Sequence, residues 1–144
     1  MTTHPRWTAS RPWAYGVPLG LGGRQQGHAD PRGGFTGPCV LGFNLRGDYP
    51  NMMRPAYLTS PTLDCSRLRQ AELRFRRWLN VEALPADRAA IEVSTDGVTW
   101  HTVWENTVAV TDSSWELMTL DLSAYADGCG SFRLRWVMGP TNRR

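Results

Sequence analysis

The sequence predicts an all-β fold, an antiparallel β-sandwich. Its 144 residues include seven Trp, fourteen Gly and ten Pro. Gly and Pro break helices and favour tight turns, whereas aromatic side chains suit the half-buried surface of a pleated sheet. From Cys39 onward, short runs of alternating polar and apolar residues are separated by turn signals. The length fits one domain, residues 1–144, with a single core.

Residues 1–38 are predicted to form an irregular, loop-rich N-terminal segment. Glycine and proline interrupt any periodicity there, as in Asp30-Pro31. The segment also carries aromatic side chains that need a surface to bury them, namely Trp7, Trp13, Tyr15 and Phe35. We therefore expect it to pack against the domain and not to act as a linker.

Seven strands are predicted after this segment: Cys39–Leu45, Tyr57–Pro61, Ala71–Val81, Ala89–Ser94, Trp100–Glu105, Trp115–Leu122 and Ser131–Met138. The third alternates clearly, with Leu73, Phe75 and Leu79 on one side and polar residues on the other. Pro61 cannot donate a backbone hydrogen bond, so we expect the second strand to lie at an edge or to end there. Ser123–Asp127 has room for one helical turn.

A hairpin is predicted where Asp96-Gly97 separates two of these strands, because an Asp-Gly pair between β-branched runs is a strong turn signal. The segment 94–100 also nearly matches the Asp-box of sialidase-like propellers, S-x-D-x-G-x-T-W, but it is one residue short. A propeller needs several four-stranded blades. A turn capped by Asp96, with Trp100 packed beside it, is therefore favoured over a sialidase-like fragment.

Charge and composition exclude several classes of function. All sixteen basic residues are Arg, thirteen acidic residues are interleaved with them, and this pattern does not favour nucleic-acid binding, which needs a clustered patch. No apolar run approaches the ~20 residues that span a membrane, and residues 1–11 lack the apolar stretch of a signal peptide. His4, His28 and His101 stand in no recognisable catalytic pattern, so we predict no enzyme activity.

The three cysteines, Cys39, Cys65 and Cys129, lack the paired short spacings of a zinc site. An odd number also cannot form a complete disulfide framework, so at most one bridge forms within the chain. Small buried thiols without a bridge are at least as good an interpretation.

Two irregular loops carry the oxygen ligands that calcium prefers. Asp30 lies in Gly27–Pro31, and Asp48 lies in Arg46–Asn51, where Asn51 offers a further ligand. A cation shared between the loops would order the N-terminal segment. In the alternative interpretation, the two aspartates cap turns through hydrogen bonds to nearby backbone.

Arg74 and Arg76 are candidate ligand-binding residues, since guanidinium groups pair with sulfate, carboxylate or phosphate. They would form a cationic stripe with Arg133 and Arg135 if their strands are neighbours, although solvated arginines are common on polar sheet faces. Trp78 falls on the polar side of its strand, so its ring is a candidate platform for stacking on a sugar.

Eight runs carry a family resemblance: Gly27–Pro31, Asn44–Tyr49, Tyr57–Pro61, Leu63–Ser66, Phe75–Glu82, Trp104–Asn106, Thr111–Trp115 and Arg135–Thr141. On these runs the chain resembles jelly-roll modules, related in shape to MAM and concanavalin-like domains, from large secreted proteins of planctomycetes and myxobacteria. The resemblance implies a sandwich of jelly-roll type and an extracellular, non-catalytic accessory module that binds a carbohydrate or a protein surface. Such modules often accompany proteases, so a protease-associated fragment is a less favoured alternative.

The resemblance also implies a structural Ca²⁺, for which we carry over Asp30 and Asp48, with Asn51 as a weaker candidate. Such modules usually continue after the Met-Gly-x-Thr turn into a final strand with a G-W-N-I-D-D-V-like pattern, which this sequence does not contain. We expect the segment around Trp7–Val17 to fill the open sheet edge. In the alternative, a strand from another copy fills it and the protein is a self-assembling sandwich.

Overall fold

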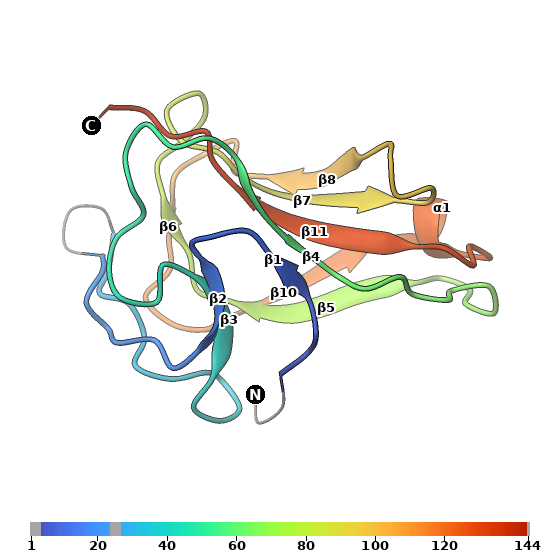
Figure 1. Ribbon diagram of the computed structural model, residues 1–144, viewed down its shortest axis with the longest axis horizontal. Coiled ribbons are helices and arrows are strands. Elements are labelled where there is room, and N and C mark those ends of the chain that lie inside the picture. The colour runs from blue at the N-terminus through green and yellow to red at the C-terminus, as the bar shows by residue number, and fades with distance from the viewer. Residues whose placement is uncertain (1–3, 24–26, 144) are drawn as a thin grey trace.

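The computed structural model describes residues 4–23 and 27–143, and in these ranges it contains eleven short strands and one helical turn (Figure 1). They are β1 (Thr8–Ala9), β2 (Trp13–Gly16), β3 (Val40–Phe43), β4 (Ala56–Thr59), β5 (Glu72–Arg77), β6 (Asn80–Val81), β7 (Ala89–Ser94), β8 (His101–Glu105), β9 (Val110–Thr111), β10 (Glu116–Asp121), α1 (Ser123–Ala126) and β11 (Arg133–Met138). The predicted domain and N-terminal segment also include residues 1–3, 24–26 and 144, which lie outside the described ranges. Within those ranges no helix has the length and apolar character that a membrane crossing needs.

The larger sheet has five strands in the order β1-β4-β11-β7-β8, and each neighbouring pair is antiparallel. β11 lies at its centre, where it pairs along its whole length with β7 and over four residues with β4. β1 covers the outer edge of β4 with two residues. A covered edge offers fewer free backbone groups to another chain.

Three two-stranded ribbons, β5–β10, β2–β3 and β6–β9, contain the remaining strands of the described ranges. The main core lies between the five-stranded sheet and the β5–β10 ribbon, because Val93 of β7 shares an apolar cluster with Leu73 of β5 and Leu120 of β10. Phe132 is its largest fully buried side chain. Figure 1 shows β5 and β10 as a layer separate from β7 and β11. The all-β antiparallel sandwich is thus confirmed, while its jelly-roll topology stays a prediction.

Most predicted strands occur where the alternation placed them. The strand Ala89–Ser94 is reproduced in full as β7, and it forms the expected antiparallel hairpin with β8. The single helical turn forms at Ser123–Ala126. β4 ends at Thr59, as the position of Pro61 predicted, and it lies one strand in from the edge of the sheet. Pro61 follows the strand, so its missing backbone N–H does not interrupt the ladder.

The predicted strand Ala71–Val81 is wrong in one respect, because it breaks after Arg77 into β5 and β6. Asp112 causes the break. Its carboxylate accepts a 3.0 Å hydrogen bond from the Leu79 amide and two from the Arg77 guanidinium, at 2.9 and 3.0 Å. The Leu79 N–H therefore cannot donate to a neighbouring strand. The chain continues as β6, which pairs with β9.

The N-terminal segment is more regular than predicted, since it contains β1 and β2. As expected, it packs on the domain: the Trp7 ring lies 5.0 Å from that of Trp136, and Trp13 stands edge-on to Phe43 at 5.2 Å. β1 extends the sheet at β4, and β2 pairs with β3. In the described ranges β5 still has β10 as its one ladder partner.

The turn between β7 and β8 has the geometry of a capped hairpin. The Asp96 carboxylate accepts hydrogen bonds from the backbone of Val98 and Thr99 at 2.8 and 2.7 Å, and these bonds hold its pKa well below the usual value. Gly97 adopts the positive φ of +77° that such a turn requires. Trp100 packs under the Arg135 guanidinium at 3.9 Å. These contacts give the near-match to the Asp-box a structural explanation.

Asn106 is a buried polar residue that sequence reasoning missed, and it is 1 % exposed. Its Oδ1 accepts a hydrogen bond from the Ala89 amide at 2.7 Å. Its Nδ2 donates to the carbonyls of Glu82 and Asp87 at 2.6 and 2.9 Å. One side chain therefore joins the start of β7 to the loop before it.

We expect Asn106→Ala to lower the free energy of unfolding by about 2–4 kcal/mol, because three buried backbone groups lose their partners. Urea unfolding measures the change. Thr107→Ala, at the neighbouring exposed position, is the matched control and should stay within about 0.5 kcal/mol of the parent chain. A loss below about 1 kcal/mol at Asn106 would contradict this role.

Candidate functional site: a cleft between β3 and β5

A cleft of about 400 Å³ is lined by residues of both β3 and β5. Consecutive residues of both strands line it, namely residues 40–45 and 75–80. In the described ranges β3 pairs only with β2, and β5 pairs only with β10, so each of these two strands has one edge without a ladder partner.

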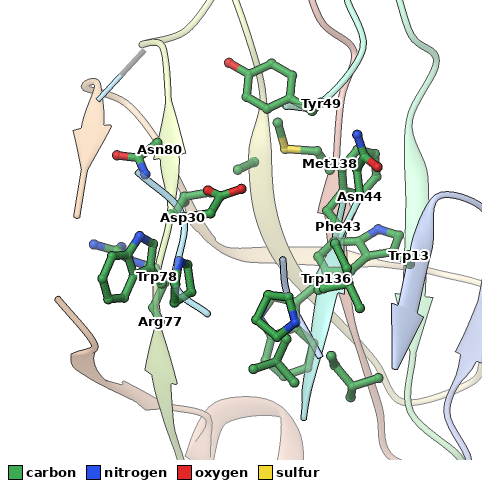
Figure 2. Close-up of a pocket in the computed structure, with 18 of the residues that line it drawn as sticks. Trp13, Asp30, Phe43, Asn44, Tyr49, Arg77, Trp78, Asn80, Trp136 and Met138 are labelled. Carbon is green, nitrogen blue, oxygen red and sulfur yellow. The ribbon is translucent and has the colours of Figure 1, made fainter. Parts of the chain in front are cut away.

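The floor of the cleft is apolar. It is formed by residues 89–91 of β7 and residues 136–138 of β11, with Trp104 of β8 beside them. Figure 2 shows Trp78 and Arg77 on one side of the space, Trp13 and Phe43 on the other, and Trp136 between them. Five of the seven tryptophans of the chain line this cleft: Trp13, Trp78, Trp104, Trp115 and Trp136.

One end of the cleft is acidic, where Asp30, Asp48, Glu82 and Asp87 contribute to the lining. Asp87 is 2 % exposed, and both of its carboxylate oxygens accept hydrogen bonds within the protein. Its carboxylate accepts hydrogen bonds from the Tyr49 hydroxyl at 2.5 Å and from the Asn142 amide at 2.9 Å. Burial, reinforced by Asp87, raises the pKa of Tyr49, so this phenol stays protonated.

Asp30 and Asp48 lie close enough to repel one another, and Figure 2 shows Asp30 pointing into the space between the walls. Burial raises the pKa of Asp30 above its usual value, the charge of Asp48 raises it further, and a bond from the Gly22 backbone partly offsets both effects. The Asp48 carboxylate accepts a hydrogen bond from the Gly23 amide at 2.6 Å. The bond between Gly23 and Asp48 joins residues 25 positions apart, so local turn capping does not describe Asp48.

Asn51, the third predicted calcium ligand, is exposed and lines the same cleft. In the parts of the chain that the structure describes, no group of three or more His, Cys, Asp or Glu side chains is arranged to hold a metal ion. A cation at Asp30 and Asp48 would thus need backbone carbonyls, Asn51 or water for its remaining ligands.

A pair of hydrogen bonds that the sequence does not reveal holds the loop with Asp30. The Asn80 side chain accepts from the His28 amide at 3.2 Å and donates to the His28 carbonyl at 3.0 Å. Gly27 is required here, because its φ is +76° and a Cβ would approach Asn80 Oδ1 to 2.1 Å. β6 thereby fixes the position of one wall of the acidic end.

The predicted ligand-binding residues separate into two groups. Trp78 and Arg76 line the cleft, whereas Arg74 lies outside it and forms an exposed ion pair with Glu72. The Trp78 ring packs edge-on against Trp115 at 5.8 Å, and its buried indole N–H finds no hydrogen-bond partner in the described structure. The Arg76 guanidinium lies 4.1 Å from the centre of the Phe35 ring.

The cationic stripe is not formed. β5, which carries Arg74 and Arg76, pairs with β10, whereas β11 lies between β4 and β7 in the other sheet. Arg135 is also engaged, because it forms a 2.6 Å ion pair with Glu92. Sequence alternation assigned these arginines to polar faces but could not show that the faces belong to different layers.

We expect Asn80→Ala to release the loop 27–31 without unfolding the sandwich. Both hydrogen bonds to His28 are lost, while the strands on either side keep their ladders. Limited proteolysis should then cleave this loop several times faster than in the parent chain. Asn51→Ala removes an exposed amide from the same cleft and serves as the control. Equal cleavage rates in the two variants would contradict the role of Asn80.

No protein-family model, curated protein or solved structure matches this chain. The likeness to MAM-like jelly-roll modules therefore stays an expectation from the sequence runs, and the cleft is interpreted from its own geometry.

Proposed function

We propose that this chain is a non-catalytic binding module whose cleft accepts an extended segment of a protein partner. The observation that carries the proposal is the cleft of about 400 Å³ that residues of both β3 and β5 line. Each of these strands has one ladder partner in the described ranges. The backbone N–H and C=O groups on the unpaired edge of either strand are the groups to which we propose that a third strand binds.

An extended peptide suits this space because its main chain can form hydrogen bonds with a strand and its side chains can pack on an apolar surface. Its main chain would hydrogen-bond to β3 or β5, and its alternate side chains would enter the apolar floor at Trp136 and Met138. The acidic end formed by Asp30 and Asp48 complements a basic residue or a bound cation. A partner segment of alternating apolar residues with a basic end is therefore the occupant we propose.

A protein segment is favoured over a carbohydrate. Sugars stack on aromatic faces that stand open to solvent. The Trp78 ring is instead packed edge-on against Trp115, and its indole N–H is buried. The predicted sugar platform is thus part of the cleft wall.

Binding is favoured over catalysis because two polar groups of the cleft lining, Asp87 and Asn80, have structural partners. Asp87 binds Tyr49 and Asn142, and Asn80 binds His28. Acid–base chemistry requires a group that is free to exchange a proton with a substrate. These side chains instead hold the N-terminal segment and the loops against the sheets.

Selection from a display library of random twelve-residue peptides against the immobilised chain tests the proposal. We expect the enriched peptides to alternate apolar and polar residues and to carry Lys or Arg at one end. N-methylation of alternate backbone amides in a synthetic copy should weaken binding at least about tenfold, because strand addition relies on main-chain hydrogen bonds. Hydrogen exchange should show new protection in β3 and β5.

Two matched variants locate the binding site. Leu41→Lys places a charge in the cleft lining and should weaken binding of the selected peptide, whereas Leu117→Lys, at a 56 % exposed position on β10, should not. Peptides that tolerate N-methylation would overturn the proposal without depending on either variant. A concentration-dependent dimer that protects the same strands would replace the protein partner with a second copy of the chain.

We further propose that Asp30 and Asp48 bind Ca²⁺, with oxygen ligands completed by Asn51, backbone carbonyls and water. Burial and then the repulsion from Asp48 raise the pKa of Asp30, and the repulsion supports this proposal because a cation placed between the carboxylates would relieve it. Since the folded-state pKa of Asp30 is raised, its contribution to stability is fully present below the unfolded pKa, about 3.9, and is lost as the pH rises through the folded pKa.

We therefore expect calcium at about 100 times its dissociation constant to raise the melting temperature at pH 7 by several degrees relative to chelator. Asp48→Asn should abolish this response, and in chelator it should be at least as stable as the parent chain because the repulsion with Asp30 is gone. Thermal melting of both chains with calcium and with chelator measures the difference. An unchanged melting temperature in the parent chain would exclude the cation and leave the peptide proposal unaffected.

A further inference from the structure

Cys65 and Cys129, which the sequence left unassigned, are neighbours in the fold. Cys65 follows β4, and Cys129 lies between α1 and β11. The Cys65 amide donates a hydrogen bond to the Cys129 carbonyl at 2.8 Å. Beside it, Leu63 and Phe132 form an antiparallel bridge with bonds of 2.8 and 3.1 Å. These backbone contacts fix the spacing between the two cysteines.

The spacing suits a disulfide. Two residues that exchange both backbone bonds, as Leu63 and Phe132 do, have Cα atoms about 5.5 Å apart, which is within the usual separation in a disulfide. The bond from the Cys65 amide to the Cys129 carbonyl continues this pairing. Both side chains also face the same place, because Cys65 belongs to the main apolar core and Cys129 packs against it. The thiols lie close enough that Cys129 contributes to the raised pKa of Cys65.

Cys39 is held elsewhere. It precedes β3, on the ribbon that β3 forms with β2, and its thiol hydrogen-bonds to the Tyr15 side chain. All three thiols are reduced in the structure. The fold thus separates one cysteine from the other two, which spacing along the sequence could not do.

We infer that Cys65 and Cys129 are a redox-active pair that forms an intramolecular disulfide with a low-molecular-weight disulfide as the oxidant. A Cys129 thiolate attacks one sulfur of that disulfide, forms a mixed disulfide and releases one small thiolate. The Cys65 thiol then gives up its proton, attacks the Cys129 sulfur and releases the second small thiolate. The two protein thiols are oxidised by two electrons, and one small disulfide is reduced to two thiols.

The order of attack follows from the surroundings of the two thiols. Burial first, and then the nearby Cys129, Asp64 and Asp127, raises the pKa of the Cys65 thiol. Cys65 is 7 % exposed, whereas Cys129 is only partly buried. A protonated and buried thiol is a poor nucleophile toward an external disulfide. Cys129 is thus the entry point, and Cys65 resolves the mixed disulfide.

The bridge would join the end of β4 to the start of β11, which are neighbours in the five-stranded sheet. It closes a long loop that contains β5 to β10 and α1. Figure 1 shows α1 at the end of the molecule away from the loop of residues 27–39. Neither cysteine lines the cleft, so the test of the pair does not depend on the proposed binding function.

Incubation of the full chain with excess oxidised glutathione tests the inference. We expect an intact mass lower by about 2 Da, a single cross-link between the peptides of Cys65 and Cys129, and a Cys39 thiol that still reacts with iodoacetamide. The oxidised chain should melt roughly 10 °C above the reduced chain, since the closed loop is long.

Cys39→Ser is the matched control and should keep both the mass loss and the gain in melting temperature. Cys129→Ser should lose both. Cys65→Ser should stop at a mixed disulfide with glutathione on Cys129, a trapped first step that a purely structural role for Cys65 does not predict. A bridge that includes Cys39, or full alkylation of all three thiols after oxidation, would overturn the inference.

Discussion

Trp136 joins the two layers of the sandwich, and the rest of the structure depends on its position. It lies on β11, the central strand of the large sheet. Its ring contacts Trp7 at 5.0 Å and stands perpendicular to Phe75 of β5 at 5.4 Å. Each such aromatic pair contributes about 0.5–1.5 kcal/mol beyond the area it buries. The same ring forms part of the cleft floor, so the residue that holds the layers together also shapes the candidate site.

Ion pairs around Glu92 connect strands on the outer face of the large sheet. Glu92 of β7 is 8 % exposed, and its carboxylate bonds Arg135 of β11 at 2.6 Å and Arg88 at 3.1 Å. Removing one partner from such a buried pair leaves an uncompensated charge, which is strongly destabilising. Arg135 also stacks on Trp100 and Tyr57 at 3.9 and 4.3 Å. This arrangement ties β7, β11 and β4 together and withdraws Arg135 from any ligand surface.

The sequence predicted the strands and turns that depend on residues close together in the chain. The alternation of polar and apolar residues predicted β7 and β11, and the Asp96-Gly97 turn predicted the hairpin of β7 with β8. These signals act within about ten residues of the chain. The break at Trp78 depends on Asp112, which arrives from a distant loop, and no window around β5 contains it. Asp30 and Asp48 were predicted as residues of one site, but the cleft around them was not. Its walls and floor come from strands far apart in sequence, so side-chain periodicity cannot show which edges face one another.

The concentration of tryptophan around the cleft gives the molecule a built-in optical signal. Trp13, Trp78, Trp104, Trp115 and Trp136 all border the space, and only Trp7 and Trp100 of this chain stand outside its lining. Indole emission responds to the polarity of its surroundings, and displacement of water from the cleft changes those surroundings for most of the fluorophores at once. The emission spectrum of the unlabelled protein therefore records whether the cleft is wet or filled, with no dye, tag or added chromophore.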